Sequence, residues 1–151
     1  MKKIYKYLLA TVFVLTVNPI KAQILQPVHW SYAAKKTGVN EAVVFLKADI
    51  DEGWHVYSQQ VAPGGPVKTS FKFNLSADYI LVGSVTEPKP INRFEDVFGM
   101  TVSFFEKSVI FQQKLKLKKG QTKVSGTLEY MTCNDEKCLP PDNVEFTIPV
   151  K

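Results

Sequence analysis

The chain has 151 residues, of which 45% are hydrophobic and 22% charged, with two cysteines and a formal net charge of +5. Lysine and glutamate residues are interspersed and no basic stripe is present, so the sequence does not indicate a nucleic-acid-binding protein. No repeat or low-complexity linker divides the chain, and its length fits one domain.

The first 22 residues are predicted to be a secretory signal peptide. They combine a basic start, an apolar run over residues 7–17, and a small residue, Ala22, before the expected cleavage site. The apolar run is far shorter than the roughly 20 residues that span a bilayer, so we expect no stable membrane insertion after cleavage. An uncleaved signal anchor is the alternative. Cleavage removes four lysines and no acid, which lowers the net charge from +5 to +1.

The mature part, residues 23–151, is predicted to form one all-β domain. Stretches of alternating or continuous apolar residues indicate the strands. Residues 61–66 are predicted to form a loop, and residues 102–117 form either one bent strand or two. We expect about eight short strands and no amphipathic helix, which is typical of an immunoglobulin-like antiparallel β-sandwich. The expected strands cover residues 28–33, 42–50, 54–58, 69–74, 79–85, 102–117, 124–130 and 144–150.

Both cysteines, Cys133 and Cys138, lie in the turn between the last two predicted strands. A tight hairpin can close the four-residue gap with the Cα atoms within about 5.5 Å, so the two can form a disulfide. In a loop this short such a bond contributes only about 2 kcal/mol to stability. Export places it in an oxidising compartment, and an exposed turn is accessible to another protein's thiolate. The spacing alone leaves a redox couple and a structural hairpin disulfide equally open.

Two other segments can share this end of the sandwich. His55 and Tyr57 point to one side of a short strand and Trp54 to the other, because neighbouring side chains alternate. These are either core aromatics or part of a site. Residues 93–100 are predicted to form a loop that carries large apolar side chains. Such side chains either enter a core or cover a reactive site.

Residues 130–141 resemble the cysteine motif of the periplasmic N-terminal domain of DsbD, the transmembrane disulfide reductase of bacteria. Residues 53–57 are similar to the aromatic strand of that family and residues 94–100 to its cap loop. The resemblance extends over nearly all of residues 24–151. It implies an immunoglobulin-like domain of the periplasm that carries electrons by dithiol–disulfide exchange.

The resemblance also implies partners for this exchange. A thioredoxin-like protein or domain would reduce the domain, and a periplasmic disulfide isomerase or a cytochrome c maturation thioredoxin would accept the electrons. No cofactor is implied, and whether such a component of a protein-disulfide reductase is an enzyme in its own right stays open. The best-known members continue into membrane and thioredoxin-like domains that are not found in this sequence, so we expect the donor to be a separate protein.

Applied to this sequence, the resemblance makes Cys133 and Cys138 the redox couple, with Cys138 forming the mixed disulfide. Val97 and Phe98 would shield it. The best-known members have one more residue between the cysteines and a tyrosine at the position of His55. The residues implied to line and cap the site are His55, Tyr57, Glu95, Asp96, Val97 and Phe98.

The residues between the cysteines indicate how reactive the couple is. Negative charge on Asp135 and Glu136 disfavours a thiolate, and Lys137 offsets this only in part. We therefore expect thiols that react slowly with small oxidants and depend on a partner to align the sulfurs.

The resemblance favours exchange over other functions. A non-enzymatic secreted binding module with a structural hairpin disulfide is the main alternative. A metal site built from Cys133, Cys138, His29 and His55 would need ligands from three distant segments without the usual paired spacing, so no metal is expected. No Ser-His-Asp set or phosphate-binding loop indicates a hydrolase or transferase.

Overall fold

The computed structural model describes residues 25–151, so the predicted signal peptide lies outside the described residues. Within them the elements are all β-strands, and no helix is long and apolar enough to cross a membrane. The eleven strands of this part are β1 (Val28–Gly38), β2 (Glu41–Ile50), β3 (His55–Tyr57), β4 (Ser70–Phe73), β5 (Tyr79–Thr86), β6 (Ile91–Glu95), β7 (Met100–Glu106), β8 (Ser108–Leu117), β9 (Thr122–Tyr130), β10 (Thr132–Cys133) and β11 (Asp142–Val150).

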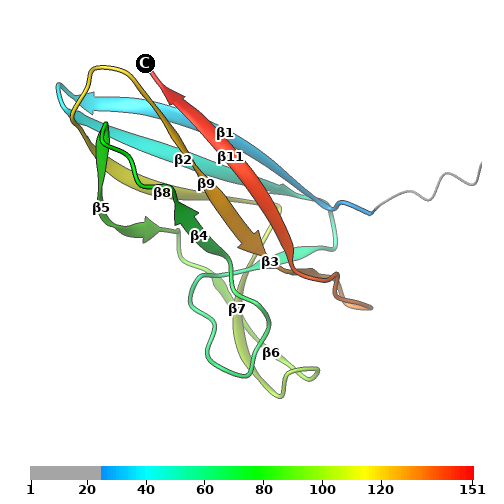
Figure 1. The fold of residues 1–151 in the computed structure, drawn as a ribbon. Coiled ribbons are helices and arrows are strands. Elements are labelled where there is room, and N and C mark those ends of the chain that lie inside the picture. Colours follow the sequence, from blue (N-terminus) through cyan, green and yellow to red (C-terminus); the bar gives the residue numbers. More distant parts are fainter. Residues whose placement is uncertain (1–24) are drawn as a thin grey trace, which may run out of the picture.

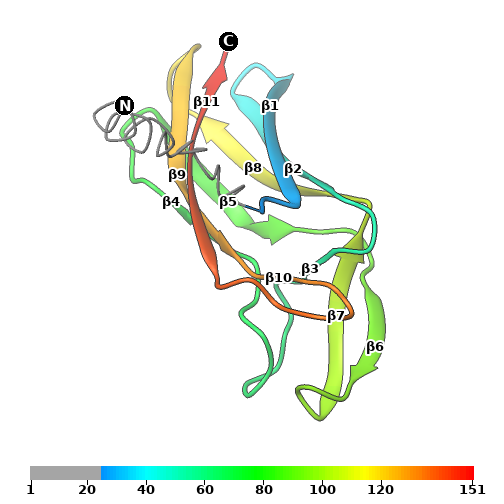
Figure 2. The same cartoon turned by 90° about the vertical axis from the view of Figure 1, so that its right-hand side faces the viewer.

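The strands form three antiparallel sheets. One sheet has the order β1-β2-β8-β5, and the sheet β11-β9-β4 lies over it to make the two layers of the sandwich (Figures 1 and 2). The third sheet, β10-β3-β7-β6, extends from one end of these layers. The predicted immunoglobulin-like antiparallel β-sandwich is confirmed. The third sheet, which holds the two cysteines at its edge, was not predicted as a separate unit.

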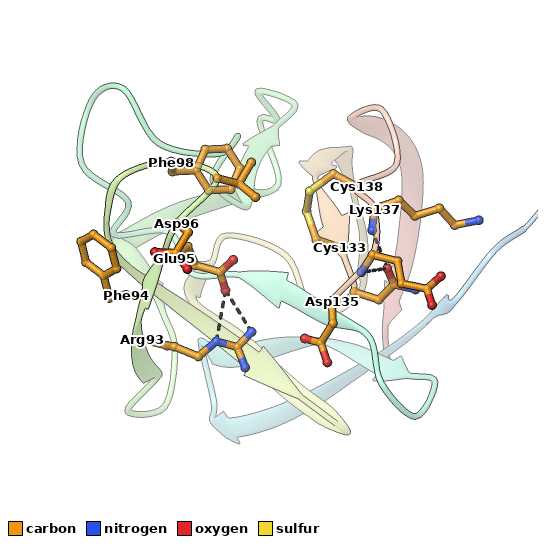
Figure 3. Close-up of a pocket in the computed structure, with 12 residues that line it drawn as sticks. Arg93, Phe94, Glu95, Asp96, Phe98, Cys133, Asp135, Lys137 and Cys138 are labelled. Carbon is orange, nitrogen blue, oxygen red and sulfur yellow. Dashed lines mark hydrogen bonds and ion pairs between the residues drawn. A yellow bond between two sulfur atoms is a disulfide. The ribbon is translucent and has the colours of Figure 1, made fainter.

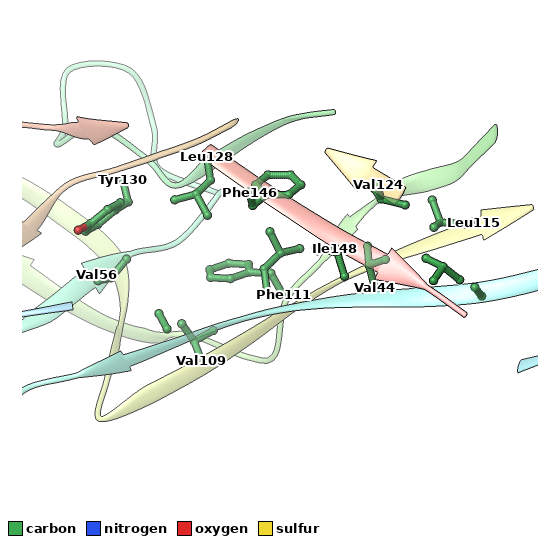
Figure 4. Packing of buried hydrophobic residues seen from close by; sticks show 14 of the residues in the cluster. Val44, Val56, Val109, Phe111, Leu115, Val124, Leu128, Tyr130, Phe146 and Ile148 are labelled. Atoms are coloured by element: carbon green, nitrogen blue, oxygen red, sulfur yellow. The ribbon is translucent and has the colours of Figure 1, made fainter. Parts of the chain in front are cut away.

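The core between the layers follows from the alternation along the strands. In β8 the side chains of Val109, Phe111, Leu115 and Leu117 are buried on one face, as predicted, and residues of β9 and β11 cover them (Figure 4). The ring of Phe111 packs against several other aromatic rings, with its centroid 4.9 Å from that of Phe71. Removing this apolar surface from water is the main stabilising contribution to the sandwich.

The long apolar segment 102–117 is two strands, and the break between them positions the third sheet. Lys107 has a φ of 63° and separates β7 from β8. Its carbonyl oxygen accepts a 2.8 Å hydrogen bond from the amide of Ile50, at the end of β2. β8 therefore stays in the sandwich while β7 leaves it to pair with β3 and β6.

Some predicted boundaries were wrong. The first strand extends to Gly38 because it pairs with nearly the full length of β2. The segment 93–100, predicted as a loop, begins with three residues of β6 and ends with the first residue of β7, and only residues 96–99 connect the two strands. The reason is cross-strand pairing with β7, which supplies backbone hydrogen bonds that no local pattern reveals.

Candidate functional site

The two cysteines close a short hairpin at the edge of the third sheet. Their sulfurs form a disulfide, and their Cα atoms lie 4.0 Å apart. The amide of Leu139 donates a 2.9 Å hydrogen bond to the carbonyl oxygen of Thr132 across this hairpin. Within the turn, Asn134 Oδ1 accepts hydrogen bonds from the amides of Glu136 and Lys137, at 3.0 and 2.8 Å. The Asn134 side chain thus accepts hydrogen bonds from two backbone amides of the turn and stabilises the turn that holds the sulfurs together.

The two sulfurs have different surroundings. Cys133 belongs to β10, is only 1% exposed, and packs with Tyr57, Val102 and Phe104 in a second apolar cluster separate from the main core. Cys138 follows the turn and is exposed. An attacking group from outside therefore reaches Cys138 first.

Strand register brings the other residues to the same face as Cys133. Cys133 is the cross-strand partner of His55 in β3, and His55 in turn is opposite Glu106 in β7. Directly paired residues share a face, as do residues two apart along a strand. By this rule, one face of the third sheet presents Cys133, His55, Tyr57, Val102, Phe104, Glu106, Arg93 and Glu95. Trp54 points to the other side and packs against the main core, as predicted.

His55 and Tyr57 form a buried polar pair on this face. The Nε2 atom of His55 lies 3.2 Å from the Tyr57 hydroxyl and 4.0 Å from Oε1 of Glu95. Burial lowers the pKa of His55, while the negative charge of Glu95 acts in the opposite direction. Burial, with a further contribution from Glu95, raises the pKa of Tyr57 to about 12. Both side chains are therefore neutral at pH 7.

Arg93 fixes the Glu95 carboxylate in this position. Its Nη2 atom donates a 2.9 Å hydrogen bond to Oε1 of Glu95, and its guanidinium lies 4.6 Å from the centroid of the Phe104 ring. The hydrogen bond to Glu95 raises the pKa of Arg93, which keeps the guanidinium charged. A charged pair therefore lies at the rim of the site, above the aromatic cluster.

The residues that connect β6 and β7 form a cap loop, residues 96–99. The amide of Gly99 donates a 2.9 Å hydrogen bond to the carbonyl oxygen of Glu95, and Gly99 has a φ of 62°, which suits a residue without a side chain. The ring of Phe98 packs edge-on against that of Tyr57, with centroids 6.1 Å apart. Val97 instead is 83% exposed.

A pocket of about 470 Å³ separates the cap loop from the disulfide. Figure 3 shows the disulfide on one side of this pocket, with Phe98, Glu95 and Arg93 on the other. Asp135 and Glu136, from the cysteine turn, also line it. The pocket is thus a cleft that opens onto the Cys133–Cys138 bond and has both apolar and charged walls.

The profile of one protein family, described as "Thiol:disulfide interchange protein DsbD, N-terminal", matches residues 21–149. The chain belongs to this family. The resemblance noted in the cysteine motif is confirmed, and the family is one of thiol–disulfide exchange.

Solved structures of the DsbD N-terminal kind share the fold. The Neisseria meningitidis DsbD N-terminal domain in its reduced form is 18% identical with a TM-score of 0.53, and the match covers 83% of this chain and 89% of that one. The N-terminal periplasmic domain of ScsB from Proteus mirabilis is 18% identical with a TM-score of 0.58, covering 84% of this chain and 49% of that one. A search of curated proteins gives no match.

Within this DsbD N-terminal fold, the structure brings together most of the residues suggested by the sequence. His55, Tyr57, Glu95 and Phe98 surround the buried side of the disulfide. His29 does not join them, since it pairs with Asp51 at 3.3 Å. Among residues 25–151, no group of three or more His, Cys, Asp or Glu side chains is arranged to hold a metal ion.

Sequence reasoning missed two site residues, Arg93 and Phe104. Arg93 lies two residues before Glu95 and would have been placed on the same face had β6 been predicted as a strand. Phe104 reaches the site because β7 pairs with β3, and a contact between segments so far apart leaves no local signal in a single sequence.

Proposed function

We propose that this chain is a periplasmic thiol–disulfide exchange domain that carries electrons between a thioredoxin-like dithiol reductant and periplasmic oxidoreductases. The observation that carries the proposal is a disulfide with one exposed and one buried sulfur, at the edge of a pocket, in a member of the DsbD N-terminal family. The similar ScsB domain is a periplasmic one, which supports this location.

The two sulfurs suit a two-step exchange. A thiolate of the reductant attacks Sγ of Cys138, forming a bond between the proteins, and Cys133 leaves with the electron pair and takes up a proton. The second thiolate of the reductant then attacks the sulfur that the reductant's first cysteine contributes to the mixed disulfide. Sγ of Cys138 leaves and is protonated. The reductant becomes a disulfide and this domain a dithiol. The same steps in reverse reduce an acceptor disulfide.

The electrons pass from sulfur to sulfur, so the reaction requires no cofactor. Asp135 and Glu136 are exposed beside Cys138, and their charge disfavours a free thiolate there. Reduced Cys138 would then react slowly until a partner aligns the sulfurs. Disulfide isomerases and cytochrome c maturation thioredoxins of the periplasm are the acceptors that we propose.

The reduction potential of the Cys133–Cys138 couple tests this function. We expect a value above about −300 mV, because a structural disulfide in an exported protein is more resistant to reduction. The measurement equilibrates the protein with glutathione or dithiothreitol buffers, alkylates the free thiols and weighs the products. A lower potential, or a bond that no thioredoxin-like reductant opens while the protein stays folded, would instead support the inert binding module.

Removal of the Phe98 ring tests the proposed cap. Phe98 lines the pocket and packs on Tyr57, so Phe98→Ala is expected to speed reduction by dithiothreitol about threefold or more, since access limits exchange. Val97→Ala is a matched control: its side chain is already 83% exposed, so we expect a smaller effect. The double variant combines Val97→Ala with Phe98→Ala. Equal rates of reduction in the wild type, both single variants and the double variant would contradict the capping role.

A further inference from the structure

His55 is a buried titratable group that the exchange steps above do not use. It is 2% exposed and directly opposite Cys133 in the pairing of β3 with β10. Side chains so paired point to the same face, with Cβ atoms about 5 Å apart. Thr132 Oγ1 donates a 2.8 Å hydrogen bond to the His55 carbonyl oxygen and holds the two strands in this register.

The imidazole is held by contacts on its other sides. Its ring lies 4.8 Å from that of Phe104 and 5.1 Å from that of Tyr57, measured between centroids. Its Nε2 atom is directed to the Tyr57 hydroxyl, with the Glu95 carboxylate behind it. The titratable or charged groups around the ring are Tyr57 on β3, Cys133 on β10, Arg93 and Glu95 on β6, Glu106 on β7 and Asp135 in the cysteine turn.

The buried Cys133 thiol needs a proton acceptor, and the imidazole of His55 lies on the same sheet face. To close the disulfide again, the buried Cys133 thiol must lose its proton, yet burial disfavours a free thiolate. Bulk water has little access to a side chain that is 1% exposed. A neutral base on the same sheet face removes the need for a long-lived buried thiolate.

We propose that His55 is the proton acceptor for Cys133 in the resolving step, an inference that rests on the proposed exchange function. In the mixed disulfide between Cys138 and an acceptor protein, the Cys133 thiol transfers its proton to His55 as its sulfur attacks Sγ of Cys138. The Cys133–Cys138 bond forms, the bond to the acceptor breaks, and the acceptor's sulfur leaves as a thiolate. The imidazolium then returns the proton to that thiolate or to water.

The contacts of Nε2 indicate which ring nitrogen acts. When Nε2–H donates to the Tyr57 hydroxyl, Nδ1 keeps its lone pair and is the ring nitrogen that is free to accept a proton. Glu95, 4.0 Å from Nε2, stabilises the imidazolium once the proton has moved. Glu95 is therefore a positioning residue. Burial lowers the pKa of His55, so the ring is unprotonated and available at pH 7.

The experiment separates the two steps with a small disulfide, 5,5′-dithiobis(2-nitrobenzoate). The fully reduced protein is mixed with one equivalent. Attack by Cys138 releases a first coloured thiolate, and resolution by Cys133 releases the second. Cys133→Ser, which releases only the first, calibrates the signal. His55→Gln keeps a polar side chain beside Tyr57 but cannot take up the proton. His29→Gln alters a histidine outside the site whose side chain is 63% exposed.

We expect His55→Gln to slow the second release about tenfold or more at pH 7 while leaving the first release unchanged. His29→Gln should match the wild type in both. An unchanged second release in folded His55→Gln overturns the inference and leaves the exchange function intact. If the wild type fails to give even the first release, the proposed function fails, and this inference with it.

The pH dependence of the wild type gives a second test that needs no variant. With His55 as base, the second release should level off at a pH below the ordinary histidine value of about 6.5 and stay level until the thiol ionises. Without a base, the rate follows the thiolate fraction, so it rises tenfold per pH unit with no plateau until the thiol itself ionises. That rise is expected of His55→Gln, and finding it in the wild type overturns the inference.

Discussion

Changing Cys133 to serine is expected to leave this protein covalently bound to a thioredoxin-like partner, whereas changing Cys138 to serine should leave it nearly unreactive. In the first variant the exposed Cys138 sulfur can still attack a disulfide of the partner, but no neighbouring thiol remains to release the partner. In the second variant the remaining sulfur belongs to a residue that is 1% exposed. Both lose the same disulfide, about 2 kcal/mol of stabilisation, so this loss does not distinguish them.

A defined probe makes this comparison quantitative. A thioredoxin-like protein that retains only its exposed active-site cysteine is loaded with thionitrobenzoate and mixed with each variant, and non-reducing gels and mass spectrometry follow the mixed disulfide. We expect Cys133→Ser to react about tenfold faster or more, because exchange depends on access to the thiol. The double serine variant is the control for non-covalent association. Equal rates for the two single variants would contradict the assignment of Cys138 as the sulfur that meets the partner.

Gly126→Ala is expected to lower the free energy of unfolding by about 3 kcal/mol, because an added methyl group has no room there. Gly126 lies in β9 between Phe73 of β4 and Phe146 of β11, which are its cross-strand partners. A Cβ atom at this position would clash with the Lys72 carbonyl oxygen and lie 2.8 Å from Cζ of Phe146. The two phenylalanine rings pack edge to face over the glycine, with centroids 5.4 Å apart.

Gly120→Ala is the matched control for this prediction. Gly120 precedes β9, and a Cβ atom there would have no heavy atom within 4 Å. We expect its free energy of unfolding to stay within about 0.5 kcal/mol of the wild type. Chemical denaturation of the oxidised proteins, followed by tryptophan fluorescence, measures both. A Gly126→Ala protein as stable as Gly120→Ala would show that β4 can move away from β9 at little cost.

Several features of the site follow from neighbouring residues. His55 and Tyr57 share a side while Trp54 points to the opposite one, since a strand alternates its side chains. The hairpin disulfide follows from the short gap between the cysteines. By contrast, Arg93, Phe94 and Glu95 of β6 were predicted as part of a loop, because only Phe94 among them is a large apolar residue. Their strand conformation depends on hydrogen bonds to β7.

The all-β class, the disulfide and the family can be inferred from the chain alone, because alternation, cysteine spacing and the motif around the cysteines are local properties. The burial of Cys133, the exposure of Cys138 and the approach of His55, Glu95 and Phe98 to them depend instead on the three-dimensional fold. The physical reason is that the third sheet joins distant segments: Thr132 and His55, bonded across its edge, are 77 residues apart. Such pairing is selected by the packing of the whole domain and not by any one segment.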